Sequence, residues 1–164
     1  MTPVSSEVLN ALSAGIQSEV ASYVFYTEAA KKTEAAAFKE VLEKLAHEEK
    51  EHFHILERQH HSLIVSEQWI STADVMKMEG LPEIGEDMAE KHRPLIDEVH
   101  KADSIKTILD IAYRLEEEAF NLFSREAQRS VSPEGRKIFE DLARFEKGHM
   151  GVVKDMMRRY LGAD

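Results

Sequence analysis

Cysteine is absent from the 164 residues of the chain. This absence excludes disulfide bonds, iron–sulfur clusters, thiol nucleophiles and four-cysteine iron or zinc modules within the sequence. Long apolar runs are absent as well, and the first residues, MTPVSSEVLN, have neither the basic nor the apolar region of a secretion signal. We therefore expect a soluble, cytoplasmic protein without a membrane partner.

An excess of basic residues is also lacking. The 31 acidic residues outnumber the 21 basic ones and give a formal net charge of -10. Such a charge repels phosphate backbones and anionic lipid surfaces, whereas it raises the local concentration of cations. Nucleic acid is therefore not an expected partner. The length predicts one domain over residues 1–164, with a core that needs no disulfide.

Apolar residues recur every three or four positions in four long segments, which predicts four helices. These form two helical hairpins, residues 5–61 and 104–162, with breaks near Thr33 and at SVSP, where Ser132 and Pro133 are typical of a helix start. Polar residues interrupt the four apolar faces at six positions: Glu19, Glu49, His52, Glu116, Glu146 and His149.

Residues 62–103 contain glycine and proline, and enough apolar residues for one or two short helices, such as TADVMKM and EDMAEKH. A helix of about 27 residues is about 40 Å long, and a connection of this size can run that distance back along a bundle. Two antiparallel helix pairs joined by one long crossover form the ferritin-like arrangement. The predicted fold is therefore an all-α, ferritin-like four-helix bundle.

The two predicted hairpins are copies of each other. A shift of 97 residues aligns EKLAHEEKEH, residues 43–52, with EDLARFEKGH, residues 140–149, and six of these ten positions are identical. Without a gap, the same shift aligns Glu19 with Glu116 and Tyr26 with Phe123. We interpret the two halves as one helical hairpin used twice.

The repeat also selects among the Glu-x-x-His pairs of the second segment, which are Glu49/His52, Glu51/His54 and Glu57/His60. Only Glu49/His52 lies on the apolar stripe, and only that pair recurs 97 residues later, as Glu146 and His149. The neighbouring residues of HEEKEH, among them Glu48, are expected on the surface or at the edge of a site.

If the six polar residues converge inside the bundle, they place four carboxylates near one another. Without partners such a cluster would be costly and would force protonation or an influx of water. Two divalent cations balance the four carboxylates while both histidines are neutral, and a diferric site with one oxide bridge balances them equally well. Oxygen and imidazole ligands without sulfur fit iron or manganese, and zinc less specifically. One Glu from each of two helices and Glu-x-x-His from each of two others is the recurrent di-metal carboxylate pattern.

Four stretches, SEVASYVFYTEAA, EKLAHEEKEHFHIL, LEEEAFNLFSREA and FEDLARFEKGHMGVV, resemble the rubrerythrin-related branch of the ferritin-like di-iron superfamily. The resemblance covers all four long helices. It implies two metal ions per chain, with iron the expected metal and manganese or a mixed pair as alternatives. It also implies the ligand roles: terminal carboxylates Glu19 and Glu116, metal-bridging carboxylates Glu49 and Glu146, and one imidazole for each metal from His52 and His149.

The chain departs from rubrerythrins proper in two respects. They carry a four-cysteine rubredoxin module, and they have a further glutamate one turn beyond the ligand of the third helix, where this chain has Ala119. The predicted ligands are therefore a symmetric set of six, closer to the bacterioferritin type. Tyr26 lies two turns after Glu19, where similar proteins place a tyrosine near the metals, but packing explains it about as well because Phe123 stands at the paired position.

The resulting hypothesis is a di-metal oxidoreductase that reacts with dioxygen or peroxide. It would oxidise iron(II), reduce peroxide, or do both, with electrons supplied by another protein. A shell-forming iron-storage protein is a second interpretation, although the final MRRYLGAD leaves no room for a fifth helix. A helical interaction protein with an idle metal site is a third. The expected assembly is a homodimer.

Overall fold

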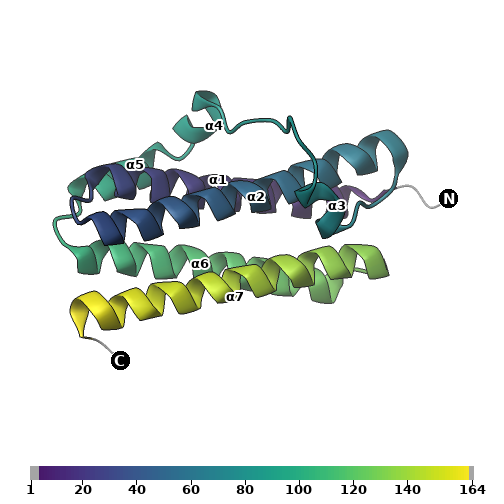
Figure 1. The fold of residues 1–164 in the computed structure, drawn as a ribbon. Helices are drawn as coiled ribbons and strands as arrows, with labels where there is room; N and C mark the ends of the chain where they lie inside the picture. The colour runs from purple at the N-terminus through teal and green to yellow at the C-terminus, as the bar shows by residue number, and fades with distance from the viewer. Residues whose placement is uncertain (1–3, 163–164) are drawn as a thin grey trace.

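Four long helices form the molecule in the computed structural model, which describes residues 4–162. They are α1 (Ser6–Lys32), α2 (Ala36–Ser66), α6 (Ile105–Arg129) and α7 (Pro133–Leu161). Helix α1 packs along α2, and α6 packs along α7, as two antiparallel pairs (Figure 1). The predicted all-α, ferritin-like bundle is therefore confirmed. The expected domain span also includes residues 1–3 and 163–164, which lie outside the described residues.

Local signals in the sequence account for most of the helix ends. Serine side chains cap the starts of three long helices: Ser5 for α1, Ser104 for α6 and Ser132 for α7. Each hydroxyl accepts a hydrogen bond from a first-turn N–H, which would otherwise lack a partner. Helix α7 ends at Gly162, whose φ of 67° is a backbone conformation that favours glycine. Helix α2 continues to Ser66, past the predicted end at residue 61.

The crossover runs along the outside of the first helix pair, from one end of the bundle to the other (Figure 1). It contains α3 (Thr72–Met76), α4 (Glu86–Glu90) and α5 (Arg93–Lys101). The first two are the short helices that the sequence predicts, whereas α5 is an additional one. A proline in a sequence usually indicates that a helix is interrupted. Pro94, however, lies in the first turn of α5, where a backbone N–H would have no partner within the helix, so its absence does not destabilise the helix.

Polar and aromatic contacts fasten the start of the crossover to the bundle. The buried Gln59 of α2 donates a hydrogen bond to the carbonyl of Ile70 at 2.7 Å and accepts one from its N–H at 2.9 Å. The Thr72 hydroxyl donates to Asp141 of α7 at 2.8 Å. Trp69 packs against the apolar cluster at this end of the bundle, with its ring edge-on to Phe139 of α7.

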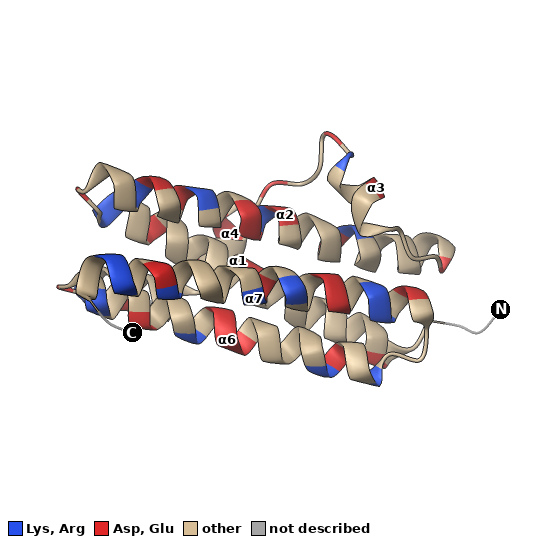
Figure 2. Cartoon of the chain, turned by 60° about the horizontal axis from the view of Figure 1, so that its bottom comes forward, with Lys and Arg blue, Asp and Glu red and all other residues tan. Residues whose placement is uncertain are grey.

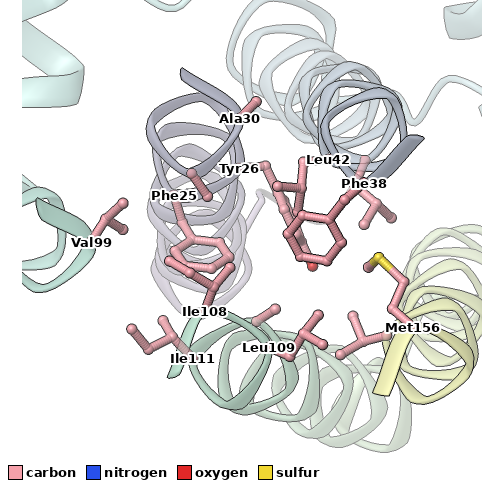
Figure 3. Packing of buried hydrophobic residues seen from close by; sticks show 14 of the residues in the cluster. Phe25, Tyr26, Ala30, Phe38, Leu42, Val99, Ile108, Leu109, Ile111 and Met156 are labelled. Carbon is pink, nitrogen blue, oxygen red and sulfur yellow. The ribbon is translucent and has the colours of Figure 1, made fainter. Parts of the chain in front are cut away.

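Apolar side chains fill the bundle in two main clusters, and the six polar residues lie between them. Along α1, Leu12 belongs to one cluster and precedes Glu19, whereas Phe25 belongs to the other and follows it. Figure 3 shows the second of these clusters, in which Phe38 points into the space enclosed by the four helices. Val99 of α5 packs on its outer side (Figure 3). The polar residues are thus enclosed by apolar layers at both ends.

Acidic and basic residues are interspersed along the lengths of α2, α6 and α7 (Figure 2). This mixed distribution differs from the clustered basic surface that nucleic-acid binding uses. None of the helices within residues 4–162 combines the length and the apolar character that crossing a membrane requires.

Candidate metal centre

The structure brings together all six polar residues that the sequence singles out. Helices α1 and α6 supply one glutamate each, and α2 and α7 each supply a glutamate and a histidine three residues apart, which place both side chains on one helix face. Each of the six is at most 6% exposed: Glu19, Glu49, His52, Glu116, Glu146 and His149.

His52 is surrounded by three carboxylates. Its Nδ1 atom lies 3.0 Å from Glu146 Oε1, 3.2 Å from Glu49 Oε2 and 3.6 Å from Glu19 Oε2. These distances place one ring nitrogen of α2 among oxygens from α1, α2 and α7. Helix α6 supplies none of them, so this group forms one half of the centre.

His149 forms the matching half. Its Nδ1 atom lies 2.9 Å from Glu49 Oε1, 3.4 Å from Glu116 Oε1 and 3.7 Å from Glu146 Oε2. The two imidazole rings stack with centroids 5.3 Å apart. Glu49 and Glu146 therefore contact both histidines. Each histidine has one outer carboxylate of its own, Glu19 for His52 and Glu116 for His149.

The donor atoms of this cluster suit a metal. One ligand atom from each of four residues, Glu49, His52, Glu146 and His149, lies within 4.8 Å of the others. Carboxylate oxygens and imidazole nitrogens are the ligands that iron, manganese and zinc take when sulfur is absent. These four residues could hold a metal ion.

Buried oxygens without partners test whether a metal fits. Among the described residues, five buried carboxylate oxygens have no hydrogen-bond partner: both of Glu19 and one each of Glu49, Glu116 and Glu146. Each such atom carries the free-energy cost of lost hydration unless something else satisfies it. A cation ligated by these oxygens would satisfy them and neutralise the carboxylates. The residues present therefore fit a metal centre.

Protons balance the buried charge when the polypeptide is alone. Burial, together with the charges of Glu146 and Glu49, raises the pKa of Glu19 well above its ordinary value, and the pKa of Glu116 is raised for the same reasons. Burial opposes ionisation of His52 too, but hydrogen bonds and the charges of Glu146 and Glu49 outweigh it and raise the pKa of that histidine. A metal that binds here must displace such protons.

Tyr26 lies beside one half of the centre. Its hydroxyl donates a hydrogen bond of 2.6 Å to Glu116 Oε1, and both groups are buried. Its ring also packs edge-on against Phe25, with centroids 5.1 Å apart. Tyr26 therefore both contacts a carboxylate of the cluster and packs in the core, so each of the two interpretations left open by the sequence describes part of its environment. Phe123, at the paired position, has no hydroxyl and stacks against Phe139.

Glu48 is the residue at the centre that the sequence does not single out. Its Oε2 atom lies 2.8 Å from His149 Nε2, the ring nitrogen that points away from the other carboxylates. The sequence predicts only that Glu48 lies on the surface or at the edge of a site, and this prediction does not specify a contact with His149. The repeat carries no signal for it because the paired residue is Phe145, which stacks on His52 with ring centroids 5.2 Å apart.

A groove of about 410 Å³ between α2 and α7 leads to the two histidines. His52 and His149, both buried, lie at its inner end, whereas Met76 and Val152 on its wall are exposed. The groove is large enough for a molecule of a few atoms. It connects the cluster with solvent on the side where Glu48 lies.

The model of the rubrerythrin family matches residues 10–157, a span that contains all six polar residues and the whole crossover. The chain belongs to the rubrerythrin family. Neither a curated protein nor a solved structure matches it. The resemblance inferred from the sequence is thereby confirmed. The 164 residues contain no cysteine, and Ala119, one turn after Glu116 on α6, is buried.

Proposed function

We propose that the chain is a di-iron carboxylate protein that reacts with dioxygen or peroxide. The observation that carries this proposal is the set of buried carboxylate oxygens that lack partners around two histidine Nδ1 atoms. A core built for stability alone would contain apolar residues there, since unpaired buried carboxylates destabilise the fold. Membership of the rubrerythrin family supports the same function.

The two halves of the cluster suggest how two ions would be held. Glu49 and Glu146 contact both histidines and would bridge the ions. The outer ligands of one ion would be Glu19 and His52, and those of the other would be Glu116 and His149. Manganese, alone or mixed with iron, would suit the same ligands.

Iron would supply the redox chemistry: two iron(II) ions would give one electron each, and peroxide would take up these two electrons and two protons from solvent to form two waters. The residues of the chain do the rest. Tyr26 fixes the orientation of Glu116 through its hydrogen bond. The apolar clusters exclude water from both ends of the centre, and the groove beside His149 admits a small oxidant from solvent. Electrons would come from an external donor protein, and the expected assembly is a homodimer.

Reconstitution tests this function. Metal-free protein is loaded with iron(II) without oxygen, bound iron is counted, and the loaded protein is mixed with peroxide or dioxygen while the iron(III) absorption is followed. We expect two iron ions per chain and rapid oxidation. The double variant Glu49→Gln and Glu146→Gln should lose the iron, whereas the control Glu51→Gln, on the groove wall, should keep it. Failure of the wild type to bind iron, or inertness to both oxidants, would contradict the proposal.

Iron storage, the alternative function, predicts a different assembly. A storage protein encloses its mineral in a large shell, whereas the proposed oxidoreductase needs only a small oligomer. Size-exclusion chromatography with light scattering distinguishes the two functions, and a particle of cage size that accumulates far more iron than two ions per chain would favour storage.

A further inference from the structure

The two halves of the cluster have matching sets of ligand types but different supporting residues. We propose that the two metal positions are therefore inequivalent, with Glu48 acting as a positioning residue that makes the Glu116/His149 position the tighter one. This inference rests on the proposed di-metal function and deepens it, because it says which position fills first and which residue causes the difference.

The repeat identifies where the halves differ. Under the shift of 97 residues the ligands coincide, since Glu19 pairs with Glu116 and Glu49/His52 with Glu146/His149. Among the neighbouring pairs that differ, two include a polar residue that contacts one of these ligands. Tyr26 is paired with Phe123, and Glu48 is paired with Phe145. In both pairs a polar residue of the first half stands where the second half has a phenylalanine.

Both polar residues support the same half of the centre. Tyr26 donates to Glu116 at 2.6 Å, and Glu48 lies 2.8 Å from Nε2 of His149. Helices α1 and α2 carry these two residues, whereas α6 and α7 carry the ligands that they contact. The outer ligands of this position are thus held from the opposite helix pair.

The other half has apolar residues at the corresponding places. Phe145 stacks on the ring of His52, and Phe123 packs into the apolar core. Among the described residues, neither carboxylate oxygen of Glu19 has a hydrogen-bond partner. The outer ligands of this position are buried by packing, but no paired polar residue fixes their orientation.

This difference has a direct consequence for metal affinity. A carboxylate that accepts the Nε2–H of a metal-binding histidine fixes its tautomer, leaves the Nδ1 lone pair free for the metal, and makes the ring a stronger donor. Ligands that are already oriented lose less conformational freedom on binding. Loss of such a supporting residue typically weakens metal affinity by about 10–100-fold. We therefore expect the Glu116/His149 position to bind about tenfold or more tightly than the other.

Cobalt(II) is a suitable probe because its visible absorption and its binding heat both report occupancy without any turnover. Metal-free, full-length protein is titrated with cobalt(II) and followed by absorption and calorimetry. Two separate binding steps are expected. Crystals grown with one equivalent of cobalt should show anomalous density beside Glu116 and His149, and weaker density beside Glu19 and His52.

Substitution at position 48 tests the cause. Glu48→Ala should weaken the first step by about 10–100-fold and leave the second step nearly unchanged, and Glu48→Gln, which keeps an acceptor oxygen, should fall between. Glu51→Ala is the matched control, because Glu51 lies on the same groove wall but contacts His47 at 3.4 Å instead of a ligand. It should leave both steps unchanged.

The reciprocal substitution, Phe145→Glu, places a carboxylate at the paired position beside His52. It should strengthen the second step and bring the two steps together, with circular dichroism as the check that the helices are intact. Two equal steps in the wild type, a first ion beside His52, or equal weakening of both steps by Glu48→Ala would overturn the inference. Absence of any cobalt binding would instead overturn the proposed function itself.

Discussion

Glu19 is the least supported of the buried carboxylates, because neither of its oxygens has a partner among the described residues. Glu49 and Glu146, by contrast, each have one oxygen hydrogen-bonded to a histidine. Burial of an unpaired carboxyl costs free energy. The contacts of Glu19 within the polypeptide therefore do not account for a buried glutamate at this position, whereas binding of a metal would.

If the buried glutamates and histidines bind a metal as proposed, their protonation predicts that metal affinity rises with pH. The pKa values of Glu19 and Glu116 are raised by burial and by neighbouring carboxylates, and the pKa values of His52 and His149 are raised by hydrogen bonds to carboxylates that outweigh burial. The metal-free site therefore still holds protons at neutral pH, and a metal must displace them. Each displaced proton makes the apparent affinity rise about tenfold per pH unit.

Calorimetric titration with cobalt(II) in buffers of different ionisation enthalpy measures the number of protons released. At least one proton per ion is expected near pH 7, and affinity should fall steadily as the pH is lowered. Affinity that does not change between about pH 5 and 8 would contradict the raised pKa values.

The Tyr26 hydroxyl is predicted to stabilise the metal-free protein. Tyr26→Phe keeps the ring that packs against Phe25 but leaves Glu116 with a further buried oxygen without a partner. A buried acceptor that loses its donor costs about 1–3 kcal/mol. Urea unfolding measures the change. Tyr23→Phe, on the half-buried face of the same helix, is the control and should change the free energy of unfolding by less than about 0.5 kcal/mol.

Residues could be predicted from the sequence where two independent patterns agreed. The six buried polar residues interrupt apolar faces and also repeat after 97 residues, so both patterns select them. Glu48 satisfies neither pattern, since its partner in the repeat is Phe145, and its contact with His149 depends on how α2 and α7 pack. The role of Tyr26 is ambiguous from the sequence for the same reason, because a hydrogen bond between two helices produces no periodic pattern in the sequence.

At the scale of elements, one buried amide is among the contacts that hold the start of the crossover. Gln59 donates to and accepts from the backbone of Ile70, so it replaces the hydrogen bonds that this segment cannot make in a helix. Gln59→Leu would leave the N–H and the carbonyl of the half-buried Ile70 without these partners. We expect a loss of about 1–3 kcal/mol in the free energy of unfolding, together with faster amide exchange in residues 69–76. Gln128→Leu, at an exposed position on α6, is the control and should change neither.

A close approach of the crossover to α7 gives a second prediction. A Cβ atom added at Gly135 would lie 2.7 Å from Cζ2 of Trp69, so Gly135→Ala must displace the indole. Overpacking of this kind costs about 1–3 kcal/mol, and the fluorescence of Trp69, the only tryptophan, should shift to longer wavelength. At the exposed Gly151 an added Cβ meets nothing within 4 Å. Gly151→Ala, the control, should therefore stabilise α7 by about 0.5–1 kcal/mol. An unshifted fluorescence spectrum in Gly135→Ala would contradict the predicted displacement of the indole.

The elements that the sequence predicts least well are those in the crossover and at the end of α2. The sequence does not reveal helix α5, because Pro94 is also compatible with a loop and only the packing of this segment against α1 favours a helix. Lys32 of α1 contributes to that packing, because its ammonium group donates to the carbonyls of Val99 and His100 at the end of α5. Such contacts between distant segments have no counterpart in a local pattern.

At the scale of the molecule, the candidate centre joins all four long helices. Each of α1, α2, α6 and α7 supplies at least one of its residues, and the apolar clusters on either side depend on the same packing. Removal of a bound metal would therefore weaken the whole bundle and not one loop. Protein with free metal at 100 times its Kd should be about 2.7 kcal/mol more stable than metal-free protein.

The metal-free protein is expected to become more stable when one of its buried, unpaired carboxyl groups is replaced. Glu19→Leu replaces a buried carboxyl without partners by an apolar side chain, so the metal-free variant should be about 1–3 kcal/mol more stable than the metal-free wild type. It should, however, gain much less stability from added metal, because one outer ligand is lost. Thermal unfolding of both proteins with and without cobalt(II) measures the four states. A metal-free Glu19→Leu protein that is less stable than the metal-free wild type would show that Glu19 has a structural role. If the variant is the more stable protein without metal and the wild type is the more stable protein with metal, the bundle sacrifices stability to keep its site.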